Sequence, residues 1–138
     1  MSEAINPEGW PRPSGYSNGM AARGRFLAIS GQIGWNERGE LVGSGFLEQA
    51  TQALRNVVAV LGAAGGEPGN LVRLTWYVVD KNEYRAALRD LGRAYREIVG
   101  EHYPAMALVQ VADLLEEGAR LEIEATAILP DGPPAAQP

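Results

Sequence analysis

Apolar residues recur at steps of three and four along two stretches of the chain, which is the spacing of one face of an α-helix. The first stretch predicts a helix over residues 46–64, ended by Gly65 and Gly66. The second predicts a helix over residues 82–99, with Asn82 as its N-cap and Gly100 at its end.

Stretches rich in β-branched and other apolar residues predict strands. These stretches cover residues 19–23, 26–31, 71–79, 105–111 and 121–129. A short edge strand is also expected near Ala4 and Ile5, within an irregular proline-rich opening that runs to Ser14. The link Arg23-Gly24-Arg25 is short enough for a tight hairpin between the strands on either side of it.

This order of elements predicts an α+β layer fold, with both helices on one face of a four- or five-stranded mixed sheet. The other sheet face is then uncovered. Residues 71–79 are too apolar for a strand with one wet face, so we expect other copies of the chain to bury that face in a homo-oligomer.

The 138 residues predict a single domain over residues 1–130, followed by a proline-rich tail, residues 131–138, that we expect to be disordered. The first residues lack the basic start and apolar run of a signal peptide, and charged residues interrupt the longest apolar helix. We therefore expect a cytoplasmic protein.

Composition narrows the chemistry and the partners. The net charge is −5, which is unfavourable for binding phosphate-rich nucleic acid or an anionic membrane. The chain has no cysteine and one histidine, which removes thiolate chemistry, disulfides and zinc sites of the Cys/His type. We expect no metal and no cofactor, and chemistry that depends on carboxylate, hydroxyl, amide, arginine and backbone groups.

Three local patterns have simple structural explanations. Residues 15–19 fit the G-x-S-x-G pattern of a nucleophilic serine, but they do not lie between a strand and a helix as that motif requires, so a turn into a hairpin is favoured. His102 is explained as a solvated imidazole near a helix end. Glu122 and Glu124 share one face of a strand; a wet face is the simpler explanation, and a partly desolvated glutamate that activates water is the alternative.

Several motifs, taken in order, resemble those of the Rid family, the reactive intermediate deaminases, which are also called YjgF-like proteins. They are Ser30-Gly31-Gln32-Ile33, the helix pattern from Gln49 to Gly65, Tyr103-Pro104-Ala105, Val111-Ala112 and Glu122-Ile123-Glu124-Ala125. The resemblance covers nearly the whole chain between Tyr16 and Ile128. It implies a chorismate-mutase-like fold and a homotrimer whose sheets form a central barrel, with clefts at the subunit interfaces.

For the best-known branch, the resemblance implies hydrolysis of 2-imino or enamine acids to 2-keto acids and ammonia. Glu122 occupies the position of the glutamate that holds the attacking water, and Tyr16, Gly31 and Ala107 match positions that shape the pocket. The arginine that clamps the substrate carboxylate is replaced by Met106, and a frequent asparagine of the second helix is replaced by Leu88.

Loss of the arginine removes a pair of charge-assisted hydrogen bonds, worth roughly 1.5–3 kcal/mol each. We therefore expect a less anionic, more apolar or aromatic ligand. Arg73, Arg12 or Arg25 is a possible replacement, although a surface ion pair is the simpler explanation for each. Trp35 and Trp76 are candidates for an aromatic wall, with at least one of them in the core or in an interface.

Two hypotheses follow. The first is a Rid-like homotrimer that binds and hydrolyses a small reactive imine or enamine metabolite in an inter-subunit cleft. The second is a non-catalytic metabolite-binding or regulatory trimer that has lost 2-iminoacid deaminase activity.

Overall fold

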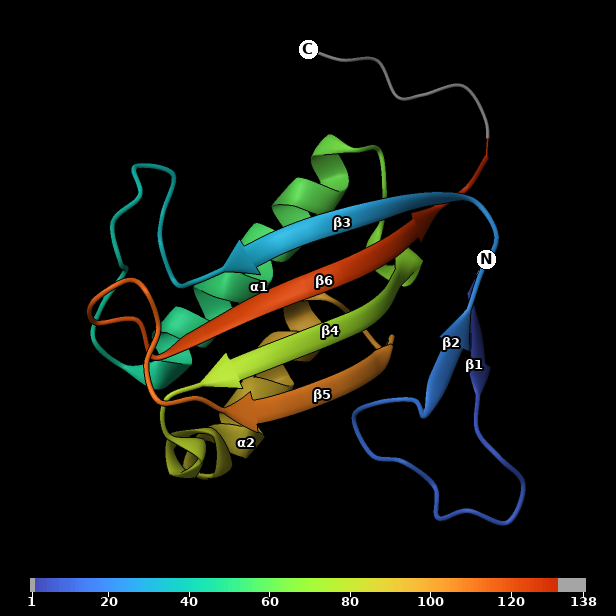
Figure 1. Cartoon of the computed structure of the whole chain (residues 1–138), viewed down its shortest axis with the longest axis horizontal. Coiled ribbons are helices and arrows are strands. Elements are labelled where there is room, and N and C mark those ends of the chain that lie inside the picture. Colours follow the sequence, from blue (N-terminus) through green and yellow to red (C-terminus); the bar gives the residue numbers. More distant parts are fainter. Residues whose placement is uncertain (1, 132–138) are drawn as a thin grey trace.

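A four-stranded mixed sheet carries two helices on one face (Figure 1). The computed structural model describes residues 2–131. Its elements are, in chain order, β1 (Glu3–Ile5), β2 (Gly19–Ala21), β3 (Arg25–Gln32), α1 (Phe46–Ala63), a 3-10 turn (Pro68–Asn70), β4 (Leu71–Val78), α2 (Lys81–Ile98), β5 (Ala105–Gln110) and β6 (Leu121–Leu129). The predicted α+β layer fold is confirmed. The predicted tail lies, from residue 132 onward, outside the described residues.

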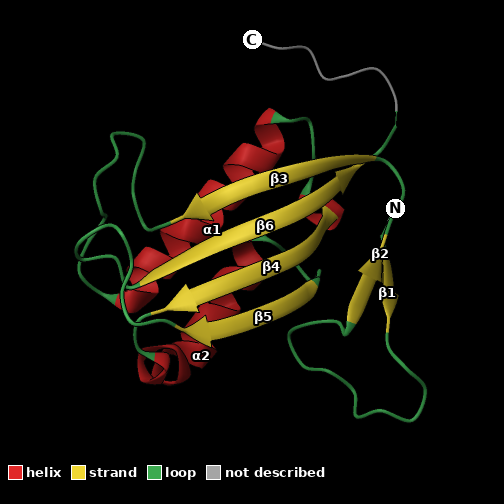
Figure 2. Cartoon of the chain, viewed as in Figure 1, coloured by secondary structure: helices red, strands yellow, loops and turns green. Residues whose placement is uncertain are grey.

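The main sheet has the order β3-β6-β4-β5. Strand β6 pairs antiparallel with β3 and with β4, while β4 and β5 run parallel because α2 connects them (Figure 2). The central strands β6 and β4 place alternate residues under the helices, and these residues are almost completely buried. The core between sheet and helices includes Leu54, Leu61, Leu74, Leu121 and Ile123, all at 0% exposure.

Both helices begin and end close to the predicted residues. Helix α1 starts after Gly45, whose backbone N–H donates to the Glu48 carboxylate at 2.8 Å, and it stops before Gly65, which has a φ of +83°. Helix α2 starts one residue earlier than predicted. Its N-cap is Asp80, whose carboxylate accepts from the backbone N–H of Asn82 at 2.9 Å, so the prediction of Asn82 as the cap is wrong.

The predicted hairpin between the second and third strands is also wrong. Strand β2 pairs with β1 in a separate two-stranded ribbon, and β3 pairs with β6 instead. The reason is the anchoring of the segment before β2: the backbone N–H of Ser17 donates to the Pro104 carbonyl at 3.1 Å, beside β5. Because β3 lies at the opposite edge of the sheet, the chain crosses past the sheet at Gly24, where a Cβ would overlap the Leu129 carbonyl.

Within residues 2–131 no helix covers the other sheet face; only residues 18–22, around β2, lie against one end of it, where they share a cavity with Phe26, Arg73 and Thr126. Phe26 is 69% exposed and Val109 is 46% exposed on this face, beside the polar side chains of Arg73 and Tyr77. Burial of this face by further copies of the chain stays a prediction.

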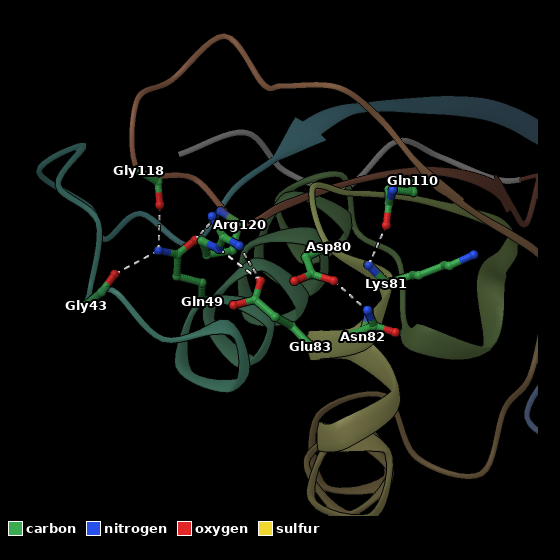
Figure 3. Close-up of polar contacts among 9 residues, drawn as sticks. All are labelled: Gly43, Gln49, Asp80, Lys81, Asn82, Glu83, Gln110, Gly118 and Arg120. Atoms are coloured by element: carbon green, nitrogen blue, oxygen red, sulfur yellow. Dashed lines mark hydrogen bonds and ion pairs between the residues drawn. The ribbon is translucent and has the colours of Figure 1, made fainter.

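The start of β6 is fixed by a polar cluster that Figure 3 shows. The side chain of Gln49 is fully buried; it donates to the carbonyls of Gly43 and Gly118 and accepts from the backbone N–H of Arg120. The guanidinium of Arg120 then donates to Glu83 of α2 from two nitrogens, at 2.9 and 2.7 Å. Strand β6 therefore starts in a set register against both helices.

Candidate active site

The residues singled out from the sequence fall into two groups on opposite faces of the sheet. Tyr16, Leu88 and Met106 line one cavity of about 540 Å³ on the helix side. Gly31 and Glu122 meet on the uncovered face, and Ala107 lies on that face of β5, in register with Thr75. One chain alone does not bring the two groups together.

Strand pairing places Met106 on the helix side. It is in register with the buried Leu74 of β4, and neighbouring residues in paired strands point to the same face. Leu88 reaches the same cavity from α2 and is 50% exposed. Tyr16 lies next to Ser17, whose hydroxyl donates to the Tyr103 carbonyl at 2.6 Å and so fixes the loop at the cavity.

Aromatic side chains form the walls of this cavity. Trp76 is in edge contact with Tyr84, with ring centroids 6.0 Å apart, and Tyr95 is stacked on Tyr103 at 5.6 Å. Burial raises the pKa of Tyr84, and burial together with the Tyr103 hydroxyl raises the pKa of Tyr95 more strongly, so both phenols are neutral donors at ordinary pH. Trp76 is 2% exposed, which confirms that at least one of the candidate tryptophans lies in the core.

On the uncovered face, Gly31 is needed for the position of Glu122. A Cβ on Gly31 would overlap the Glu122 carboxylate and come within 2.6 Å of its Cδ. The next outward glutamate, Glu124, accepts a hydrogen bond of 2.6 Å from the Tyr77 hydroxyl, and this bond is the main cause of the raised pKa of Tyr77. No side chain among residues 2–131 forms a hydrogen bond or ion pair with Glu122, so this carboxylate is free to bind water or a ligand.

The serine and histidine considered from the sequence have structural roles. The Ser17 hydroxyl donates to a backbone carbonyl, and Nε2 of His102 lies 2.7 Å from the Leu71 carbonyl. His102 is therefore half-buried and bonded rather than solvated, which corrects the expectation. These contacts leave Ser17 without the histidine partner that a nucleophilic serine requires.

Arginine is present at the cavity after all. Arg12, a candidate from the sequence, lines the cavity, as does Arg96 of α2, which was missed. A usable signal for Arg96 was its spacing, because residues 84, 88, 92 and 96 form one i, i+4 row along α2. Arg25 and Arg73 do not line this cavity. The surface ion pairs expected for Arg12, Arg25 and Arg73 are not formed within residues 2–131.

Two other classes of site find no support in the described part of the chain. Within residues 2–131, no group of three or more His, Cys, Asp or Glu side chains is placed to hold a metal ion. None of the helices in that part is long and apolar enough to cross a membrane.

Comparison with known proteins identifies the family. A family model described as endoribonuclease L-PSP matches residues 11–129. A solved structure of a Rid-family protein of unknown function from Yersinia pestis matches with a TM-score of 0.80 and 38% identity, covering 93% of this chain and 98% of that one. The chain belongs to the Rid family. Its resemblance to this family, seen first in the sequence motifs, is thereby confirmed.

Two relatives of the Rid chain carry informative names. Human 2-iminobutanoate/2-iminopropanoate deaminase is 40% identical over 105 residues, which are 75% of this chain and 73% of the human protein. A RutC family protein of Pyrococcus horikoshii is 36% identical over 129 residues, which are 92% of this chain and 98% of that protein. The first name supports a deaminase-type hydrolase at the level of the family.

Proposed function

We propose that this Rid chain hydrolyses a small reactive imine or enamine to a carbonyl compound and ammonia, as a cytoplasmic homotrimer without a metal or cofactor. Its partners are then a small metabolite and its own copies. We propose no nucleic acid partner, because a net charge of −5 disfavours binding to a phosphate backbone.

The observation that carries the proposal is the contact between Gly31 and Glu122. The carboxylate of Glu122 is unpartnered within residues 2–131, while the neighbouring Glu124 is occupied by Tyr77. Glu122 is half-buried, so its carboxylate is held at the sheet surface while part of it stays accessible to water or a ligand. Gly31 has no side chain of its own, so a ligand can approach its backbone closely beside the Glu122 carboxylate.

These groups are sufficient for addition of water to a C=N bond. Glu122 accepts a proton from water while the water oxygen bonds to the imine carbon, and it then passes this proton to the imine nitrogen, which gives a neutral carbinolamine. Glu122 next takes the hydroxyl proton of the carbinolamine and delivers it to the amino group as the C–N bond breaks, which releases ammonia, leaves the carbonyl compound and returns Glu122 to its carboxylate form. One water is consumed in total, and no redox partner is needed.

The proposed cleft combines two chains. Tyr16 and Met106 lie on the helix side of the sheet, whereas Glu122 lies on the uncovered face, so a single chain offers only half of the site. In a closed ring of three copies, each interface is the same, and the cavity of one chain can lie against the Glu122 face of the next.

A second candidate is the non-catalytic metabolite-binding trimer. It is favoured by Met106 and Leu88, because both replace polar groups that the family resemblance assigns to substrate binding. In that case the Glu122→Gln variant changes no measurable property except ligand affinity.

The test is release of ammonia from 2-iminobutanoate generated in situ. We expect a rate above that of buffer for the wild-type protein, and a loss of about 100-fold or more in Glu122→Gln, which cannot accept the proton. Glu124→Gln is the matched control, because it lies on the same face of β6 and is bonded to Tyr77; it should keep most of the activity. A wild-type rate equal to buffer with this and larger imino acids would contradict the proposed hydrolysis.

A further inference from the structure

The cavity on the helix side carries positive charge with no compensating anion. Two guanidinium groups, those of Arg12 and Arg96, line it, and the described lining residues include no aspartate or glutamate. This is unusual in a chain with 17 acidic and 12 basic residues. Neither guanidinium forms an ion pair or hydrogen bond within residues 2–131, so both are available to an anion.

Helix α2 directs one of these charges along the cavity. Leu88, Gly92 and Arg96 follow one another at i, i+4 spacing, and all three line the cavity. A Cβ on Gly92 would lie 3.4 Å from Nη1 of Arg96, so the guanidinium extends over the glycine. The Arg96 side chain therefore lies back along the helix, toward the preceding turn.

Most of the remaining lining residues of the cavity are apolar or aromatic. Met106 and Leu88 contribute flexible apolar surface, Tyr84 contributes ring surface, and the buried Trp76 lies behind Tyr84 in edge contact with it. The buried indole Nε1 of Trp76 has no hydrogen-bond partner within the described residues. A cavity of about 540 Å³ lies in the size range of small-molecule sites, and it is larger than a four-carbon imino acid requires.

We propose that this cavity selects imino acids with an aromatic or bulky apolar side chain, and that Arg96, assisted by Arg12, binds their carboxylate from the α2 side. The inference rests on the proposed function, because it names the substrate class of that same site. The carboxylate contact moves from the sheet strand, where Met106 now lies, to the helix and the N-terminal segment. The side chain of the substrate then packs on Met106, Leu88 and Tyr84.

Binding of stable keto-acid analogues tests this selection without catalysis. Isothermal titration calorimetry compares phenylpyruvate, 2-oxobutanoate and benzyl methyl ketone, which lacks the carboxylate. We expect phenylpyruvate to bind at least about tenfold more tightly than 2-oxobutanoate, because the ring buries more apolar surface. It should also bind at least about tenfold more tightly than benzyl methyl ketone, because the guanidinium bonds are charge-assisted.

Arginine variants assign the carboxylate contact. We expect Arg96→Gln to weaken phenylpyruvate binding about tenfold and to leave benzyl methyl ketone binding unchanged. Arg89→Gln is the matched control on α2, since Arg89 is exposed and does not line the cavity. Adding Arg12→Gln to Arg96→Gln should abolish the preference for the carboxylate.

Two results would overturn the proposal: tighter binding of 2-oxobutanoate than of phenylpyruvate, or equal phenylpyruvate affinity in wild type, Arg96→Gln and the double variant. A failure of the proposed hydrolysis gives a different combination of results. If imines are not hydrolysed while phenylpyruvate binds through Arg96, the ligand class is supported and the catalytic assignment fails.

Discussion

Replacing Gly31 by alanine should displace the Glu122 carboxylate without destabilising the fold. The added Cβ would overlap the Glu122 carboxylate and lie 2.6 Å from its Cδ and 2.8 Å from its Cγ. The side chain must therefore turn away by roughly 1 Å or more, and a misplacement of that size costs about 100-fold in rate. The displaced atoms belong to a flexible side chain, and alanine suits a strand better than glycine by roughly 0.5–1 kcal/mol, so the free energy of unfolding should hardly change.

The assay measures kcat for imine hydrolysis beside urea unfolding of the same preparations. Gly62→Ala, in α1, is the matched control. The added Cβ meets nothing within 4 Å, so this variant should raise helix stability by about 1 kcal/mol and leave kcat unchanged. The reasoning is refuted if Gly31→Ala keeps wild-type kcat, or if it unfolds the protein rather than slowing it.

Two further predictions concern the fold. Gln49→Leu should lower the free energy of unfolding by about 3 kcal/mol or more in urea titrations, because it leaves three backbone groups without partners. Gln52→Leu is the control, because Gln52 is only half-buried, and it should lower the free energy of unfolding far less. Equal losses in the two variants would contradict the role assigned to Gln49. Burial raises the pKa of Tyr95 in the folded protein. The neutral Tyr95 hydroxyl therefore contributes fully to stability below the unfolded-state pKa of about 10, and this contribution is lost as pH rises through the higher folded-state pKa. Tyr95→Phe should cost about 1 kcal/mol at pH 7, through the lost bond to the His102 carbonyl, and should show a shallower decline than wild type in urea unfolding above about pH 10; parallel declines would count against this linkage.

The two helices and the central strands could be predicted from the sequence, because burial of one face imposes a period that the residues repeat. Both ends of strand β6 were predicted correctly, because apolar residues occupy every inward-facing position from Leu121 to Leu129. The pairing of β2 could not be predicted in the same way. It depends on the bonding of Ser17 to the strand-β5 side, a contact between residues 86 or more positions apart that no local pattern encodes.

The site was partly predictable for a similar reason. Motif positions located Gly31 and Glu122, whose contact across β3 and β6 the structure shows. They gave no indication that Tyr16 and Met106 lie on the other side of the sheet from Glu122. Arg96 was not predicted, because an arginine on the charged side of an amphipathic helix is expected to face solvent. The sequence does not show that residues 12–16 lie at the same cavity.

Complementation between two inactive variants tests most directly whether the active site is shared by two chains. Glu122→Gln removes the base, and Leu88→Trp fills the cavity from a half-exposed position that tolerates a larger side chain. Refolded together in equal amounts, the two variants should recover about a quarter of the wild-type ammonia release, because in a random cyclic trimer one interface in four combines an intact cavity with an intact Glu122. Activity in the mixture no greater than in either variant alone would contradict the shared site.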